Sequence, residues 1–386
     1  MKNALIALTL LAVGFPAISR GADNIGALLA SLKAVGREGA GGETAATALK
    51  KLANEKPAAL LDVLAAFDGA SPDAANWLRG AIEAIAERAV AKGETLPLAE
   101  IERFVLDRKR AIAARELAWE WLSRVDPSAP ERLLPRFLDD PSGELRALAV
   151  ARELAAAEKL LAADGTKTQG RDALKALFPR SRDPQQIEAI TKKLQTLGER
   201  IDVTRHMGWV KSWRLLGPLE GLASERQRAE LPQGIPPHHA GFHLGFPPET
   251  RIDLELEHAG KIGAVRWKSV TSDDPNALVD LNKSIGKQKS AVAFALAEVE
   301  AADAVAVEIR AASPNALKIW VNDKQVFQRE EYHHHTEVDQ HVAPARLEKG
   351  KNRILLKLCQ NDQTDDWAQE WGFQLRVCDA TGKGAL

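Results

Sequence analysis

The hydrophobic pattern of this chain changes its period near Met207, and this change limits the fold more than any other feature. From about residue 50 to residue 200, apolar residues recur every three or four positions and alanine dominates, which is typical of amphipathic helices. After Met207 short runs alternate between apolar and polar residues, as in AVAVEIR (304–310) and FQLRV (373–377). At 386 residues two domains are expected. The sequence therefore predicts a multi-domain α + β protein, with an N-terminal helical array and a C-terminal all-β sandwich.

The strand pattern is clearest in residues 316–359. Residues 316–321 and 324–328 predict two strands joined by a tight turn at Asn322 and Asp323, and residues 352–359 predict a buried strand. A polar, histidine-rich loop lies between them. Further strands are expected at 212–217, where Gly217 and Pro218 end the strand, and at 251–257, 264–270, 278–281, 291–299, 304–310 and 371–378. Residues 219–249 form a long loop rich in Pro, Gly and His, and loops of this length are usually functional or mobile.

The helical region contains a weak repeat, in which an arginine precedes a small, apolar helix. Arg79, Arg115 and Arg146 occupy this position. The arrangement of helix, Asp-Pro turn and arginine resembles HEAT repeats, in which neighbouring helix pairs stack to bury their apolar stripes. We expect each arginine head to reach an aspartate or the carbonyls of the preceding turn. We expect Trp77, Trp119 and Trp121 to be core residues. A last helix, residues 185–198, is predicted to bridge the domains, with Gly198 as its cap.

The first nineteen residues have the pattern of a secretory signal peptide. Lys2 precedes an apolar run at 4–13, which is too short to span a bilayer, and residues 17–19 form a small-x-small cleavage pattern. The alternative is a buried helix at the start of the helical domain. We therefore predict a secreted or periplasmic protein with no transmembrane segment after signal removal. The expected division is 1–19 signal peptide, 20–58 helix and flexible connector, 59–201 HEAT-like domain and 202–386 sandwich.

The net charge of the chain limits the classes of molecule that it is expected to bind. The formal net charge is −1, so no basic excess is present to neutralise phosphates, and a nucleic-acid partner is not expected.

Cys359 and Cys378 each lie late in an expected strand. A direct hairpin of those strands would place Cys359 opposite about residue 373, so a disulfide needs another strand order. Two buried thiols are the alternative.

The largest concentration of polar residues is the histidine-rich loop. Glu330, Glu331, Tyr332, His333, His334 and His335 are followed by Asp339 and His341. Imidazole and carboxylate groups bind transition metals, so His333, His335, Asp339 and His341 are candidate ligands. Their spacing matches no established zinc motif. The alternative is a solvated loop between strands.

A second polar loop follows residue 359. Asn361, Asp362, Asp365 and Asp366 precede Trp367. Oxygen ligands in a loop could hold Ca²⁺, and carboxylates and amides beside a tryptophan also suit the hydroxyls and apolar face of a sugar. The alternative is a polar turn that the tryptophan anchors. No cofactor is predicted, although Ca²⁺ or a transition metal could occupy one of the two loops.

Catalytic motifs are absent from the sequence. It contains no GxSxG elbow, no HExxH and no P-loop, and the acidic residues Glu330, Glu331 and Asp339 have no feature that marks a glycosidase pair. The sequence therefore does not predict an enzyme.

Several strand motifs resemble one known family. WRLLGP (213–218), VRW (265–267), AFA (293–295), KIWVN (318–322) and the set Leu347, Gly350, Asn352 and Lys357 recur in this order in a family of largely uncharacterised secreted bacterial proteins. Members of this family carry helical repeats that resemble HEAT repeats, followed by a β-sandwich that resembles galactose-binding-like jelly rolls. Asp323 and Leu219 stand where the family usually has Gly and Phe. The resemblance covers roughly residues 59–386 and implies carbohydrate binding.

The expected function is therefore non-enzymatic binding of a carbohydrate or cell-envelope glycan by the sandwich. The candidate ligand residues are Glu331, Tyr332, His333, Asp339, Asn361, Asp366 and Trp367. Two alternatives remain open. One is a scaffold that binds a protein partner on the helical array, and the other is a metal-dependent hydrolase at the histidine-rich loop.

Overall fold

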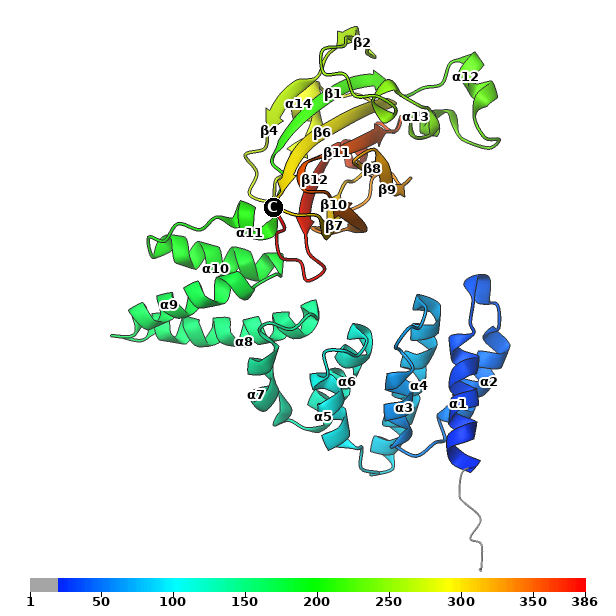
Figure 1. Ribbon diagram of the computed structural model, residues 1–386, viewed down its shortest axis with the longest axis vertical. Coiled ribbons are helices and arrows are strands. Elements are labelled where there is room, and N and C mark those ends of the chain that lie inside the picture. Colours follow the sequence, from blue (N-terminus) through cyan, green and yellow to red (C-terminus); the bar gives the residue numbers. More distant parts are fainter. Residues whose placement is uncertain (1–19) are drawn as a thin grey trace, which may run out of the picture. The chain divides into compact units, whose positions relative to one another are not determined.

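The computed structural model describes residues 20–386, and the predicted signal peptide lies outside this range. The chain forms two compact units, one ending at Pro135 and the other comprising Arg136–Leu386. Helices make up the N-terminal part and antiparallel sheets the C-terminal part (Figure 1), which confirms the α + β class. The second unit also contains the last helices before residue 207, so the compact division differs from the expected boundary at residue 201. Within residues 20–386 no helix has both the length and the hydropathy needed to cross a membrane.

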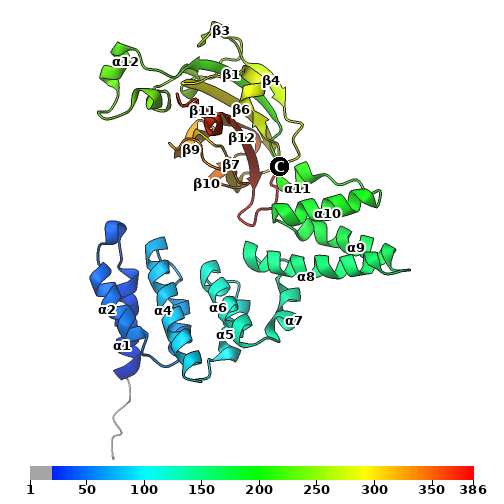
Figure 2. The same cartoon turned by 180° about the vertical axis from the view of Figure 1, so that it is seen from behind.

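The first unit is a series of packed helix pairs, which Figure 2 shows from behind. Its elements are α1 (Arg20–Lys33), η1 (Arg37–Gly39), α2 (Gly42–Leu52), α3 (Ala59–Ala65), α4 (Pro72–Ala91), α5 (Leu98–Leu106), α6 (Ile112–Val125) and α7 (Ala129–Leu133). Helix α1 packs on α2, α3 on α4, and α5 on α6, while α4 also contacts α1 and α2. Ser71 caps α4 by accepting a hydrogen bond from the amide of Ala74, and Pro72 follows at the first helical position.

Two of the three repeated arginines behave as the sequence predicts. Arg115 is buried, and its Nε donates to the carbonyl of Val105 at 2.7 Å, at the end of the preceding helix. Arg146 is also buried and donates to the carbonyl of Asp140. Arg79 differs because it is exposed and pairs with Glu83 and Glu120. Trp119 and Trp121 are buried as expected, whereas Trp77 is only half-buried.

The second unit begins with four helices. They are α8 (Gly143–Ala162), α9 (Lys167–Leu177), α10 (Pro184–Thr196) and α11 (Val203–Met207), with the 3₁₀ turns η2 (Leu134–Phe137) and η3 (Phe178–Arg180). Asp183 caps α10 by accepting from the amide of Gln186 at 2.8 Å. Ile187, Ile190 and Leu194 are buried, whereas Leu197, predicted for the same face, is 37% exposed. Gly198 follows with φ of 83°, as a C-cap requires.

The rest of the unit is a two-sheet sandwich. Its strands are β1 (Ser212–Glu220), β2 (His258–Ala259), β3 (Ala264–Val265), β4 (Lys268–Thr271), β5 (Val279–Asp280), β6 (Ala291–Ala301), β7 (Val305–Ala312), β8 (Ala316–Val321), β9 (Lys324–Arg329), β10 (His341–Leu347), β11 (Gly350–Gln360) and β12 (Gly372–Cys378). One sheet has the order β4-β1-β6-β11-β8-β9, the other has the order β10-β7-β12-β5, and β2 pairs with β3. Every pairing is antiparallel. Asn322 and Asp323 have φ of 48° and 66°, which confirms the tight turn between β8 and β9.

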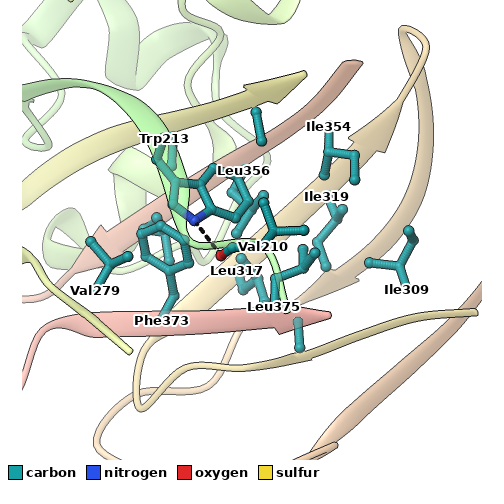
Figure 3. Packing of buried hydrophobic residues seen from close by; sticks show 14 of the residues in the cluster. Val210, Trp213, Val279, Ile309, Leu317, Ile319, Ile354, Leu356, Phe373 and Leu375 are labelled. Carbon is teal, nitrogen blue, oxygen red and sulfur yellow. Dashed lines mark hydrogen bonds between the residues drawn. The ribbon is translucent and has the colours of Figure 1, made fainter. Parts of the chain in front are cut away.

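The main core fills the space between the two sheets. Trp213 of β1 packs edge-on against Phe373 of β12 at 5.0 Å between ring centroids, and its Nε1 donates to the carbonyl of Val210 at 2.9 Å (Figure 3). Strand β6 contributes small residues such as Ala293 and Ala295 to this core. These contacts join both sheets in one apolar cluster, so the sandwich predicted from the sequence is confirmed.

The six-stranded sheet also buries its second face. The alternate residues of β6, including Val292 and Phe294, belong to another apolar cluster with Phe242 and Trp267. The segment between β1 and β2 contains the elements α12 (Glu225–Glu230), η4 (Pro237–His239), α13 (Ala240–His243) and η5 (Pro247–Glu249). Phe242 belongs to this segment, which therefore covers the sheet.

A buried lysine holds the covering segment in place. Lys357 of β11 has no exposed surface, and its Nζ donates to the carbonyls of Phe242 and Leu244 at 3.2 and 2.6 Å. The same ammonium group pairs with Glu249 Oε1 at 2.8 Å. The long segment is thus fixed to the sheet by an ion pair as well as by apolar contacts.

Three strand expectations are wrong. No strand forms at 251–257, and β10 occupies part of the expected histidine-rich loop. Strand β10 is an edge strand that contains Pro344, which obscures its pattern. Strand β1 continues through Gly217 and Pro218 with a shift in register. Strands β11 and β12 lie in different sheets, so the direct hairpin considered for the two cysteines does not form.

Both cysteines are buried and free. Burial raises the pKa of Cys359 to about 12 and that of Cys378 to about 11, because the thiolate loses hydration. We therefore expect neither thiol to react with a water-soluble disulfide reagent at about pH 8, and both to react once the chain is unfolded in denaturant. Release of chromophore from the native protein would contradict this account of the two thiols.

Candidate ligand site at the loop cluster

Three segments that are far apart in the sequence meet beside the six-stranded sheet. They are the turn around α13, the residues directly after β9 and the loop after β11. We call the contacting residues the loop cluster: His238, His239, His243, Glu330, Tyr332, His333, Asn361, Asp362 and Trp367. The two polar loops singled out in the sequence therefore do come together.

His333 connects the two loops. Its Nε2 donates to Asn361 Oδ1 at 2.6 Å, and its backbone amide donates to Asn315 Oδ1 at 3.3 Å. Its ring also meets Trp367 edge to face, with centroids 5.4 Å apart and planes at 89°. Asn361 is buried, whereas Trp367 is 63% exposed. The contacts thus fix one side of the indole and leave the rest of it to solvent.

Glu330 forms the second centre of the cluster. His243 Nε2 donates to its Oε2 at 2.8 Å, and His239 Nδ1 lies 3.1 Å from its Oε1. The His239 ring packs on Tyr332 with centroids 4.6 Å apart. The carboxylate therefore accepts a hydrogen bond from His243 and lies close to His239, although its Oε1 accepts no hydrogen bond from a described residue.

Opposite charges surround the tryptophan loop. Lys289 Nζ donates to the carbonyl of Ala368 at 2.6 Å, directly after Trp367. Burial lowers the pKa of Lys289, while the carboxylates of Asp362 and Asp365 act in the opposite direction. His238 Nδ1 lies 3.7 Å from Asp362 Oδ2. The loop thus presents hydrogen-bond donors and acceptors around an exposed aromatic ring.

Burial favours the neutral form of two histidines of the cluster, His239 and His333. Burial lowers the pKa of His239, although the nearby Glu330 carboxylate acts to raise it. Burial also lowers the pKa of His333, although the hydrogen bond to Asn361 acts to raise it. A histidine with a lowered folded pKa stabilises the fold above its unfolded pKa of about 6.5, and this stabilisation is lost as the pH falls below that value.

We therefore expect the midpoint temperature of thermal unfolding to decrease as the pH is lowered from about 7.5 to about 5.5. The reason is that His239 and His333 bind protons more readily in the unfolded chain than in the folded protein. The His333→Gln variant should show a smaller fall. The matched control is His335→Gln, since the side chain of His335 is 87% exposed. Equal pH dependence in the native protein and the His333→Gln variant would contradict this assignment.

The structure brings together four of the ligand residues expected from the sequence. Tyr332, His333, Asn361 and Trp367 belong to the loop cluster, and Asp366 is exposed beside Trp367 in η6 (Asp366–Ala368). The other two are engaged elsewhere.

Glu331 and Asp339 form ion pairs outside the cluster. Glu331 pairs with Arg329 and lies 3.5 Å from His334. Asp339 accepts hydrogen bonds from Arg310, at 2.9 Å, and from Arg376. Their carboxylates already have cationic partners, so their expected role as ligand residues has no support in this geometry.

The candidate metal ligands do not converge. Among residues 20–386 no group of three or more His, Cys, Asp or Glu side chains is placed to hold a metal ion. His333 bonds to Asn361, Asp339 to the two arginines, and His335 is exposed. His341 lies in β10 and packs on Phe327 at 4.9 Å between centroids. The backbone turns at His333 and Asp339, where φ is 61° and 65°, so the four residues reach different partners.

The sequence reasoning missed the contribution of the covering segment. His238, His239 and His243 occur there in the run HHAGFH, which was noted only as part of a long loop. His239 and His243 are four residues apart, and the short helix α13 (Ala240–His243) places both against Glu330. The helical spacing of two histidines in a loop was the available signal.

No protein-family model matches the sequence, and no curated protein matches it. Among solved structures, a GH2 beta-galacturonidase from Eisenbergiella tayi bound to glycerol is similar over 29% of this chain and 20% of its own, with 10% identity and a TM-score of 0.21. A GH31 alpha-xylosidase from Xanthomonas citri is similar over 30% of this chain and 14% of its own, with 15% identity and a TM-score of 0.19. A beta-glucosidase from Kluyveromyces marxianus is similar over 77% of this chain and 35% of its own, with 9% identity and a TM-score of 0.24. The chain thus spans about a third or less of these enzymes, and the scores are too low to support an argument.

Proposed function

We propose that the loop cluster binds carbohydrate without transforming it. The observation that carries this proposal is the exposure of Trp367, which is 63% exposed although its ring packs edge to face on His333, itself hydrogen-bonded to Asn361. All nine tryptophans lie in the described part of the chain, and Trp367 is the one among them that is exposed. A large exposed aromatic ring on a fixed loop is typical of a binding surface.

The groups around Trp367 suit a sugar. The indole face can pack against the apolar C–H face of a sugar ring, while carboxylates and imidazoles bind its hydroxyl groups. Asp362, Asp365 and Asp366 are exposed in the same loop, and His238 lies next to Asp362. Both donors and acceptors are therefore available within a few residues of the ring.

The first experiment is affinity electrophoresis of the purified protein in gels that contain plant, fungal or bacterial polysaccharides. We expect at least one polysaccharide to retard the protein and the Trp367→Ala variant to lose this retardation. Ile262→Ala is the matched control, because Ile262 is an apolar side chain 73% exposed in the loop between β2 and β3. If no polysaccharide retards the protein, the proposal is wrong.

The resemblance to secreted HEAT-like and galactose-binding-like proteins supports the same proposal. We place the protein outside the cytoplasm on the signal-peptide pattern of residues 1–19, and we describe α1–α7 as a HEAT-like array. The scaffold alternative has less support, since large apolar side chains exposed in that array, such as Val90 and Ile112, occur singly.

A further inference from the structure

A second polar site is the cavity beside β5 and β12, which has a volume of about 410 Å³. Its polar wall consists of Asp274, Asn276, Asp280, Asn282, Glu370 and Gln374. Among the described residues that line it there is no lysine, arginine or histidine. The cavity is therefore acidic, and its size falls in the range of small-molecule sites.

Gln374 is the central feature of this cavity. Its neighbours along β12, Phe373 and Leu375, point into the core between the sheets, so Gln374 points away from that core. The residue is only 6% exposed, and its side-chain amide makes no hydrogen bond with any described residue. The amide is not among the polar groups sealed from solvent, so what remains exposed of this residue opens on the cavity that it lines.

Two more polar side chains of the wall lack partners. Trp371 Nε1 and Thr336 Oγ1 are shielded from solvent and make no hydrogen bond with any described residue. Together with Gln374, they make this cavity a local concentration of unsatisfied donors and acceptors. Polar groups that are buried for structural reasons alone normally form hydrogen bonds within the protein.

The carboxylates of the wall retain free oxygens. Asp274 Oδ1 accepts from the amide of Asn276 at 2.7 Å, and Asp280 Oδ1 accepts from the amide of Lys283 at 3.1 Å. The second oxygen of each, and the Glu370 carboxylate, have no cationic partner among the described residues. Their negative charge is thus left uncompensated at the cavity wall.

We propose that this cavity binds a small molecule that carries both an ammonium group and hydroxyl groups, which is the chemistry of an amino sugar. The carboxylates attract the ammonium group, and the amides of Gln374, Asn276 and Asn282 bind hydroxyls. Anionic ligands are disfavoured by the same carboxylates. The site shares no residue with the loop cluster, so this proposal does not rest on the proposed function.

The test is a titration of the full chain with glucosamine, followed by ligand-observed NMR, with glucose and Ca²⁺ as comparison ligands. We expect glucosamine to bind at least about tenfold more tightly than glucose, because a charged hydrogen bond is lost in glucose. The Glu370→Gln and Gln374→Leu variants should each weaken glucosamine binding by about tenfold. Glu298→Gln, an exposed carboxylate on β6, is the matched control and should bind as the native protein does.

Each other outcome overturns the proposal. Equal binding of glucose shows that charge does not select the ligand, and displacement of glucosamine by Ca²⁺ shows a metal site instead. Unchanged binding by both variants places the ligand elsewhere. The Trp367→Ala variant separates the two proposals, since it should bind glucosamine normally even if glycan binding at the loop cluster is lost. Circular dichroism of each variant confirms that it folds.

Discussion

Replacement of Asp339 by alanine is expected to lower the free energy of unfolding by about 3–5 kcal/mol, because it leaves a buried arginine without its counter-charge. Arg376 is 1% exposed, and its guanidinium is held by Asp339 and by the carbonyls of Met207 and Gly382, at 3.2 and 2.8 Å. Burial alone would raise the pKa of Asp339, but the hydrogen bonds from Arg376 and Arg310 lower it below its ordinary value. The carboxylate is therefore charged and paired in the folded protein.

Chemical denaturation by urea measures this effect directly. Glu337→Ala is the matched control, since Glu337 lies two residues away and its side chain is 77% exposed. A loss below about 1 kcal/mol in Asp339→Ala, similar to that of the control, would show that the pair is only a surface ion pair.

Replacement of Glu249 by alanine is the second large perturbation. It leaves the Lys357 ammonium group buried with only two carbonyl partners, and removal of one member of a buried pair typically costs about 3–5 kcal/mol. Because Lys357 holds the covering segment, we expect this variant to be cut by a protease between β1 and β2 before it unfolds globally.

Limited proteolysis followed by mass spectrometry locates the cut. The control is Glu257→Ala, which removes an exposed ion pair with Arg266. If Glu249→Ala resists the protease as well as the control does, then apolar packing alone holds the segment on the sheet.

The strand framework could be predicted because its signals are local. Trp213, the Asn322–Asp323 turn and the alternation in β7 and β12 each depend on residues within one element. The strands that were missed or misplaced have mixed signals. Pro344 interrupts β10, and apolar residues at 251–257, such as Ile252 and Leu254, belong to the covering segment and pack on the apolar cluster without pairing as a strand.

The candidate site was harder to predict because its residues come from three separate segments. The two polar loops were recognised from composition, and the contact between His333 and Asn361 brings them together. The role of the covering segment was not visible, because it depends on a buried lysine 108 residues from its glutamate partner. The ion pairs of Asp339 were not visible for the same reason, since its partners Arg310 and Arg376 lie on β7 and β12. Long-range ion pairs of this kind leave no periodic pattern in a sequence.

The central claim is that Trp367 presents its indole to a glycan, and a binding titration with the retained polysaccharide tests it most directly. Native protein, Trp367→Phe and Trp367→Ala are compared by calorimetry. The account predicts that Trp367→Ala weakens binding by about tenfold or more, while Trp367→Phe retains much of the affinity because an aromatic face remains. Equal affinity of the native protein and Trp367→Ala would contradict the account.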